Sequence, residues 1–284
     1  MEVLFVVDPL IDIDWNEVWK AQMKRNKGAH PSRDCARIWD RKESAQRFWN
    51  MSQENKDRVG RTIAGTNISP ESRVLDVGAG PGTLAIPFAQ KVAHVTAVEP
   101  AEGMVRVLRE NMAEEGVENI SIVQKRWENV DVKEDLEPPY DVVIASFSLG
   151  MPDIQRAIEK MVDASSKYVY LYHFAGESHW DRDCRKLWPE LHGKEYHPGP
   201  KSDVLYNVLY QMGIYPNVRT FRLQHNQRFS SFEEALETLR PQYQITTKVQ
   251  ESILCDHLGR VLKQENDHFV LPATSIRVKI WWKK

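Results

Sequence analysis

A glycine-rich segment between two apolar runs constrains the fold of this chain more than any other part of the sequence. Residues 74–83 read VLDVGAGPGT, and residues 95–99 read VTAVE. This order predicts a buried strand, a glycine turn, a helix, a second strand and then an acidic residue. Glycines let the backbone approach a ligand closely, and the first turn of a helix offers free N–H groups. A carboxylate at the end of the second strand can bind a ribose diol. We therefore expect a βαβ unit that binds a nucleotide-like cofactor, rather than a glycine turn without a ligand.

The spacing of the glycines distinguishes one cofactor from another. The fingerprint of dinucleotide-binding proteins has glycines at the first, third and sixth positions of the turn. Here the glycines are Gly78, Gly80 and Gly82, so Thr83 occupies the sixth position, and Asp76 stands two residues before the first glycine. This D-x-G-x-G-x-G pattern resembles motif I of the class I S-adenosylmethionine (SAM)-dependent methyltransferases. An NAD(P) enzyme is the next alternative.

The resemblance implies SAM as the cofactor and S-adenosylhomocysteine (SAH) as its product. It implies that the glycine turn faces the amino-acid end of SAM, that Asp76 lies near the ammonium group, and that Glu99 binds both ribose hydroxyls. We assign the remaining contacts of this segment to Ala79, within the turn, and to Pro100 and Met104, which follow Glu99.

The turn after the third expected strand departs from the family pattern. Methyltransferases usually carry an acid there, which reads the adenine amino group, but this chain has Arg126. Arginine cannot accept a hydrogen bond. We assign Arg126, Trp127 and Glu128 to the adenine side of the site, with the base against the indole of Trp127 and its edge read by backbone groups or by Glu128. The alternatives are a core tryptophan and a solvated glutamate.

The turn after the fourth expected strand is the last cofactor segment that the resemblance supplies. In the family this turn faces the methionine part of SAM. Backbone carbonyls of Ala145 or Ser146 would then contact the ammonium group, and Phe147 would lie close to the reactive methyl. An ordinary strand end is the alternative.

Alternating strands and helices predict an α/β fold with a parallel sheet. The resemblance implies a Rossmann-like, doubly wound, mostly parallel seven-stranded sheet with helices on both faces and an antiparallel last strand. Strands are expected over 74–77, 95–98, 120–124, 141–145, 168–174, 217–229 and 275–282, and helices over 82–91, from Pro100 to near Gly116, and over 153–164, 202–213 and 248–264. Residues 176–202 read as irregular. We divide the chain into an N-terminal helical lid (1–65), a SAM-binding core (66–175), and a region (176–284) of substrate-covering, largely helical insertions with the final strands of the same sheet.

The acceptor side of the site is less specific in the sequence. Trp39 and Phe48 lie on an amphipathic helical segment, which is either a lid whose aromatic residues close over SAM or a helix packed on the sheet. Tyr172 and Trp180 belong to an aromatic stretch that would line an acceptor pocket, or they are ordinary strand and loop residues. His173, at the end of the fifth strand, is the candidate general base.

Composition excludes several classes of protein. The formal net charge is −2, which gives no reason to expect a nucleic-acid partner. No stretch approaches the roughly 20 apolar residues of a membrane span, and the first nine residues lack the pattern of a secretory signal. Three cysteines far apart in the sequence (Cys35, Cys184 and Cys255) fit reduced thiols. We expect a cytoplasmic protein without a metal site; the oligomeric state stays open.

The expected function is therefore transfer of a methyl group from SAM to a small-molecule acceptor, by in-line displacement. The sequence leaves three alternatives: a protein methyltransferase, a SAM-binding protein without transferase activity, and an NAD(P) oxidoreductase. Thr83 and Asp76 argue against the last of these.

Overall fold

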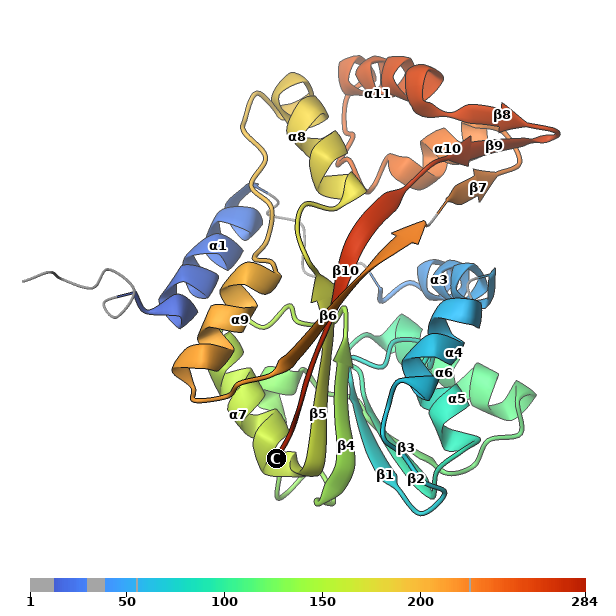
Figure 1. Ribbon diagram of the computed structural model, residues 1–284. Helices are drawn as coiled ribbons and strands as arrows, with labels where there is room; N and C mark the ends of the chain where they lie inside the picture. The colour runs from blue at the N-terminus through green and yellow to red at the C-terminus, as the bar shows by residue number, and fades with distance from the viewer. Residues whose placement is uncertain (1–12, 30–38, 55, 225) are drawn as a thin grey trace, which may run out of the picture.

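The computed structural model describes residues 13–29, 39–54, 56–224 and 226–284 and is built on one large sheet (Figure 1). The strand order is β3-β2-β1-β4-β5-β10-β6. The strands are β1 (Arg73–Val77), β2 (His94–Val98), β3 (Ile120–Val123), β4 (Tyr140–Ser146), β5 (Ser165–Phe174), β6 (Asn217–Gln224) and β10 (Thr274–Lys283). Strands β1 to β5 are parallel to one another, and β10 is antiparallel to both of its neighbours. The predicted Rossmann-like sheet with an antiparallel last strand is confirmed.

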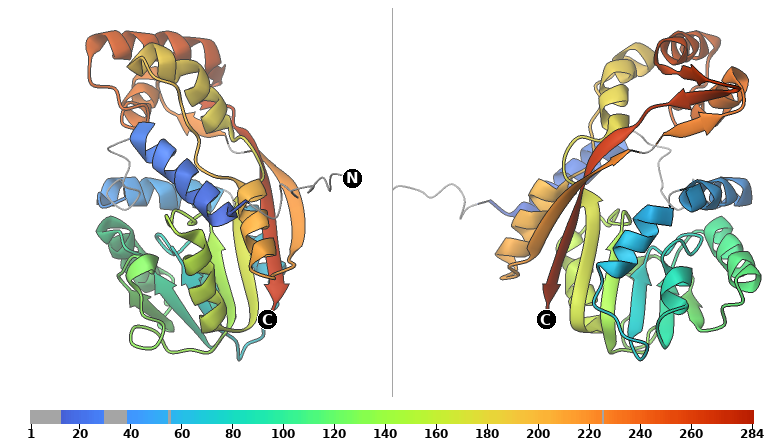
Figure 2. Two further views of the ribbon diagram at one scale, coloured as in Figure 1. Left: turned by 90° about the vertical axis from the view of Figure 1, so that its left-hand side faces the viewer. Right: turned by 45° about the vertical axis from the view of Figure 1, so that its right-hand side comes forward.

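Helices cover both faces of this sheet because the central strands are apolar on both sides (Figure 2). One face packs against α1 (Trp15–Ala29), α7 (Ile154–Ala164) and α9 (Ser202–Gln211). The other face packs against α3 (Lys42–Glu54), α4 (Lys56–Ala64), α5 (Ala85–Ala89) and α6 (Glu102–Glu114). Helix α7 starts where Asp153 accepts a hydrogen bond from the N–H of Arg156, the usual N-cap arrangement.

A second, smaller lobe lies beyond the C-terminal ends of the parallel strands (Figure 1). It contains α8 (His179–His192), α10 (Phe232–Leu239), α11 (Lys248–Val261) and a three-stranded sheet of β7 (Gln227–Phe229), β9 (His268–Leu271) and β8 (Lys263–Glu265). This upper lobe has an apolar core of its own, which includes Trp188, Tyr243 and Leu254. It therefore packs as a unit of its own, on the side of the sheet where the parallel strands end and the glycine turn lies.

The prediction was wrong in several elements of the C-terminal part. Residues 176–202 were expected to be irregular, but they contain α8, which begins with a capping box between Ser178 and Asp181 and ends at Gly193. The single strand expected over 217–229 divides between two sheets, because β6 pairs with β10 and β7 pairs with β9. The helix expected to reach 264 ends at Val261, where β8 follows.

Some predictions fall wholly or partly outside the described residues. These are the absence of a secretory signal in the first nine residues, the thiol of Cys35, and residues 1–12, 30–38 and 55 of the lid expected over 1–65. Within the described ranges, no helix is long and apolar enough to cross a membrane.

Candidate functional site

The glycine turn folds back onto the end of β2. The N–H groups of Gly78 and Ala79 donate to the carbonyl oxygen of Val98, at 2.7 and 3.1 Å. The N–H of Gly80 donates to Oε2 of Glu99 at 2.9 Å. Residues 78, 80 and 82 all have positive φ angles, a region in which glycine is favoured. The turn and the acidic residue that the sequence singled out are thus in direct contact.

The glycines of the turn are needed for different reasons. A Cβ at Gly78 would lie 2.3 Å from Cβ of Ser148, and one at Gly82 would lie 2.5 Å from Cδ1 of Leu108. At Gly80 the nearest atom would be Sδ of Met104, at 3.9 Å. Gly78 and Gly82 therefore face packed protein, whereas Gly80 is partly exposed and a Cβ there would make only an ordinary contact with Met104, so its backbone is the more accessible to a ligand.

Glu99 ends β2 as a buried carboxylate, 7% exposed. Its Oε1 accepts from the N–H of Ala101 at 2.9 Å, and its Oε2 accepts from Gly80. Burial raises the pKa of Glu99, the two N–H donors lower it, and the charge of Asp40 raises it again. A carboxylate can accept about four hydrogen bonds, so each oxygen retains the capacity for another donor. Two ribose hydroxyls would use that capacity.

Asp76, near the end of β1, is a buried carboxyl group with an unsatisfied oxygen. It is 2% exposed, and its Oδ2 has no hydrogen-bond partner among the described residues. Burial, followed by the charge of Glu99, raises the pKa of Asp76 to about 7. A buried, unpaired acceptor is costly, and a nearby ammonium group would relieve that cost. This oxygen and the partly exposed backbone at Gly80 would fit the amino-acid end of SAM.

The structure puts Trp127 into the core rather than on a binding surface. Trp127 lies in the 3₁₀ turn η1 (Trp127–Asn129) after β3 and is 3% exposed, and its Nε1 donates to the carbonyl oxygen of Ala157 at 3.0 Å. Arg126 and Glu128 beside it are exposed. This burial corresponds to the core alternative, so a base at this turn would meet backbone and the neighbouring polar side chains.

The end of β4 brings an aromatic pair next to the glycine turn. Ala145 is buried and Ser146 partly so, and Phe147 adopts a positive φ of 57° with its N–H donating to the carbonyl oxygen of Tyr172 at 2.9 Å. The Phe147 ring lies 5.2 Å from the ring of Phe174, and the guanidinium carbon of Arg277 lies 4.4 Å from the Phe147 centroid. Sequence reasoning missed Phe174 and Arg277, because only the register that pairs them between β5 and β10 reveals their proximity.

Three candidates from the aromatic stretch do not converge. Tyr172 belongs to the core on the α3–α6 side of the sheet, and burial raises its pKa to about 12. Trp180 belongs to the upper lobe, with its ring 4.7 Å from that of Tyr243. His173 lies beside Trp19 of α1, with ring centroids 6.0 Å apart. The strand alternation puts Tyr172 and His173 on opposite faces of the sheet, and Trp180 packs in the upper lobe, so these residues do not form one pocket.

His173 is held as a neutral imidazole. Its Nε2 lies 3.0 Å from the carbonyl oxygen of Pro200, which can only accept, so Nε2 carries the proton. Nδ1 is buried without a partner among the described residues. Burial lowers the pKa of His173 to about 4, although the Pro200 hydrogen bond opposes this. In this arrangement the ring orients the chain before α9, and its free nitrogen is shielded from solvent.

The segment from Trp39 into α3 crosses the first turn of α6. The rings of Trp39 and Phe48 lie 5.4 Å apart, and Oδ1 of Asp40 accepts from the N–H of Glu102 at 3.3 Å. A Cβ at Gly103 would lie 2.5 Å from the carbonyl oxygen of Trp39, so the two backbones are in close contact. The helix also reaches the upper lobe, where Nη1 of Arg47 donates to Thr238 of α10 at 3.2 Å. The segment adjoins the site because the charge of Asp40 acts on Glu99 and because the segment contacts α6, which carries Met104. Pro100 lies between Glu99 and the start of that helix.

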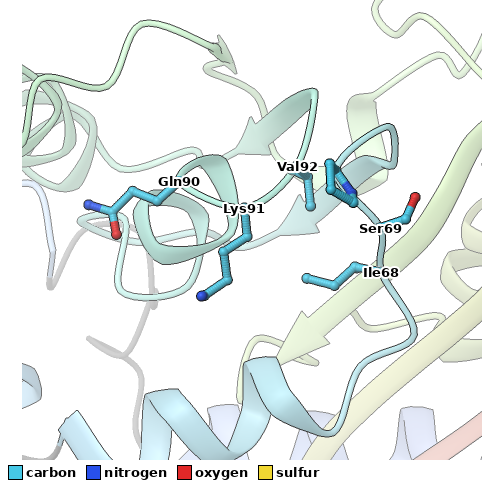
Figure 3. A pocket seen from close by; sticks show the side chains of 6 residues that line it. Ile68, Ser69, Gln90, Lys91 and Val92 are labelled. Carbon is cyan, nitrogen blue, oxygen red and sulfur yellow. The ribbon is translucent and has the colours of Figure 1, made fainter.

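A surface hollow elsewhere on the molecule is unrelated to these residues. It is lined by residues 68–70, before β1, and residues 90–92, before β2 (Figure 3). It therefore lies at the opposite end of the parallel strands from the glycine turn. In the described ranges, no group of three or more His, Cys, Asp or Glu residues is arranged to hold a metal ion.

Comparisons with known proteins agree with this geometry. A family model described as a methyltransferase domain matches residues 74–167. An uncharacterized protein of Haemophilus influenzae is 27% identical over 245 residues, which cover 86% of this chain and 88% of that protein. YcgJ of Bacillus subtilis, named an uncharacterized methyltransferase, is 26% identical over 123 residues, 42% of this chain and 47% of YcgJ.

Solved structures extend the likeness to the fold. The YcgJ crystal structure matches with a TM-score of 0.53 at 16% identity, covering 80% of this chain and 98% of YcgJ. A Bacillus halodurans structure matches with a TM-score of 0.55 at 17% identity and the same two coverages.

Proposed function

Because this chain belongs to the class I SAM-dependent methyltransferase family, we propose that it transfers the methyl group of SAM to a small-molecule acceptor by in-line displacement. The observation that carries the cofactor site is the contact between the glycine turn and Glu99. The same carboxylate that receives the N–H of Gly80 retains acceptor capacity for two hydroxyl groups. SAM supplies an activated methyl group on a sulfonium, so the protein mainly has to bind, orient and exclude water.

In this proposal three residues bind different parts of the cofactor. Glu99 accepts from the ribose hydroxyls, Asp76 balances the ammonium charge, and Gly80 lets the backbone approach. Phe147 borders the space where the acceptor meets the methyl group, with Phe174 and Arg277 beside it. His173 is assigned the orientation of the chain at Pro200 rather than proton transfer, because its free nitrogen is buried.

The small size of the acceptor is supported by what lies around the site. The Trp39–α3 segment contacts α6 on one side and α10 of the upper lobe on the other. The upper lobe lies beyond the same strand ends (Figure 1). We infer that residues 39–54 and 56–64 and the insertions after 175 cover the acceptor, which favours a small molecule over a folded protein. The net charge of −2 likewise favours no nucleic-acid acceptor.

The test begins with calorimetric titration by SAM, SAH and NADH. We expect saturable binding of SAM and SAH and none of NADH; binding of NADH alone would refute the proposal. Transfer from labelled SAM is then measured in parallel with a small-molecule extract and with a protein extract. Label confined to protein would overturn the small-molecule assignment, and SAM binding without transfer to either extract would favour a protein that binds SAM without turnover.

Replacing Glu99 by alanine is expected to weaken SAM binding without unfolding the protein. The change removes a charge-assisted acceptor, a loss of about 1.5–3 kcal/mol, or about a tenfold to a hundredfold rise in Kd. Calorimetry gives the Kd, and thermal unfolding checks the fold. Glu102→Ala, an exposed acid three residues further along the chain, is the matched control and should bind SAM as the wild type does. Equal affinity for SAM in folded Glu99→Ala would contradict the ribose role.

SAM affinity is expected to rise as the pH increases through about 7. The raised pKa of Asp76 means that its carboxyl group is protonated below about pH 7 in the free protein. The ammonium group favours the ionised form, so binding releases a proton there, and affinity gains up to about tenfold per pH unit. Glu99, whose pKa is also raised, contributes with the same sign at lower pH.

Proton release can be counted by calorimetry in two buffers of different ionisation enthalpy. The Asp76→Asn variant cannot ionise at this position, so its pH profile should be flatter across pH 7 than that of the wild type. A wild-type affinity that does not change between about pH 6 and pH 8 would contradict the proposed ammonium contact.

A further inference from the structure

Lys160 is a buried lysine whose ammonium group donates hydrogen bonds to backbone carbonyl oxygens. It lies on α7 and is 8% exposed. Its Nζ donates to the carbonyl oxygen of Trp127 and to that of Glu128, the latter at 3.3 Å. No carboxylate pairs with it within the described ranges, and burial lowers its pKa. Burying an ammonium group costs free energy, so a purely structural contact between α7 and this turn would be served by an apolar residue.

Helix α7 holds the η1 turn at two points. Besides the ammonium group of Lys160, the carbonyl oxygen of Ala157 receives Nε1 of Trp127 at 3.0 Å. Lys160 Nζ also lies 5.0 Å from the centroid of the Trp127 ring, within the range of a cation–π contact. The indole and the peptide that follows it are therefore fixed against the same helix.

The turn held in this way adjoins Glu99. Strands β2 and β3 pair with Val98 opposite Val123, and the N–H of Glu99 donates to the carbonyl oxygen of Val123 at 3.1 Å. A nucleoside whose ribose is bound by Glu99 therefore has its base close to the end of β3. The turn there lacks the acidic side chain that the family commonly uses, and Trp127 is packed inward. Recognition of the base is left largely to the backbone.

The direction of one peptide follows from the contact with Lys160. In a trans peptide the C=O and the following N–H point in opposite directions. The C=O of Trp127 accepts from Lys160 on α7, so the N–H of Glu128 points away from that helix. The N–H of Val130 donates to the same carbonyl oxygen at 3.2 Å, so Lys160 is one of two groups that hold this peptide. We propose that Lys160 is a positioning residue that fixes the Trp127–Glu128 peptide so that its N–H donates to the edge of the adenine ring. This inference rests on the proposed function, because it requires SAM at Glu99.

The proposal predicts a preference between two bases. Ring nitrogen N1 of adenine accepts a hydrogen bond, whereas N1 of hypoxanthine carries a hydrogen. A fixed N–H donor therefore matches SAH and opposes S-inosylhomocysteine, its deaminated analogue. Leaving two donors facing each other costs a hydrogen bond, so we expect the wild type to prefer SAH by about tenfold or more.

The experiment compares both ligands by calorimetry in the wild type and in Lys160→Met, which removes the ammonium group but retains an unbranched side chain. The variant should bind SAH about tenfold more weakly and should discriminate between the ligands by less than about threefold, because its peptide loses one of the two donors that hold the Trp127 carbonyl and keeps only the N–H of Val130. Lys167→Met is the control. Lys167, near the start of β5, is exposed and pairs with Asp141 of β4, so this variant should leave the preference unchanged. Lys160→Arg keeps a charged donor and should retain most of the preference.

The outcomes separate this inference from the proposed function. If the wild type does not bind SAH, the proposed function fails. If the wild type binds both ligands equally, or if Lys160→Met weakens both by the same factor, the positioning role is refuted and Lys160 only stabilises the turn. Should Lys160→Met not fold, Lys160→Gln, which retains a neutral donor, must still show a smaller preference than the wild type, and an unchanged preference would refute the inference.

Discussion

Replacing Gly80 by valine is expected to abolish measurable SAM binding in a protein that still folds. Gly80 is partly exposed, and a Cβ placed there would meet no protein atom closer than Sδ of Met104, at 3.9 Å. A side chain at this position would occupy the volume proposed for the cofactor. We expect the affinity for SAM to fall by about a hundredfold or more, a loss of about 2.7 kcal/mol or more. Calorimetry with SAM and SAH measures the loss, and circular dichroism checks the fold.

The backbone strain of this change can be measured separately at Gly116. Gly116 ends α6 with a φ of 63°, close to the 57° of Gly80, and a Cβ there would meet nothing within 4 Å. Both substitutions therefore carry a similar strain, about 1–3 kcal/mol, but only one borders the site. Gly116→Val should bind SAM normally. If Gly80→Val also bound SAM normally, the cofactor would have to lie away from this turn.

Replacing Gly78 by valine is expected to destabilise the whole fold rather than the site alone. A Cβ at Gly78 would lie 2.3 Å from Cβ of Ser148, and the residue has a φ of 76°. The hydroxyl of Ser148 also donates to the carbonyl oxygen of Val77 at 2.5 Å, which ties the turn after β4 to the end of β1. Backbone strain and overpacking together should cost about 3 kcal/mol or more. Chemical denaturation of the wild type, Gly78→Val and Gly116→Val measures the differences in the free energy of unfolding.

Gly116→Val is the control for this prediction as well, because residue 116 also has a positive φ but a Cβ there would not clash with any neighbour, whereas one at Gly78 would clash with Ser148. A Gly78→Val variant that was no less stable than Gly116→Val would show that the turn after β4 can move aside. In that case Phe147, which lies in this turn, would also be displaced, and the rate of methyl transfer from SAM would be affected more than the free energy of unfolding.

Much of the cofactor side follows from sequence because it depends on residues that are close along the chain. The strand, glycine turn, helix, strand and acid lie within 26 residues, from 74 to 99, and short-range order specifies their geometry. The contact between Gly80 and Glu99 is a direct consequence of the βαβ connection. The burial of the central strands on both faces is likewise indicated by their sequences, which are apolar over most positions, with Asp76 in β1 and Thr96 in β2 as buried exceptions.

The acceptor side depends on pairings that no local pattern encodes. Arg277 meets Phe147 only because β10 inserts between β5 and β6 and aligns Arg277 with Phe174. Helix α8 was missed because Pro189 and many charged residues obscure its periodicity, although its capping box is present in the sequence. The tertiary environment also determines the orientation of the Trp127 side chain. The sequence predicted an aromatic contact with adenine, but the indole packs against α7 in the core.

The pairing of β6 with β10 has a consequence for how such a protein can diversify. Their register sets Gln224 opposite Thr274, so the chain leaves the large sheet and returns to it at one rung of the ladder. Between these points, residues 226–273 form most of the upper lobe. Because the exit and the return are neighbours, a hairpin of a few residues could connect the two strands, provided that the apolar face of α8, which packs on this excursion, were also changed. Insertions, deletions or an exchange of the whole excursion can therefore alter what covers the strand ends while the glycine turn, Glu99 and the parallel strands keep their geometry. Under the proposed function, the segment that covers the acceptor can therefore change in evolution while the segments that bind the cofactor stay the same.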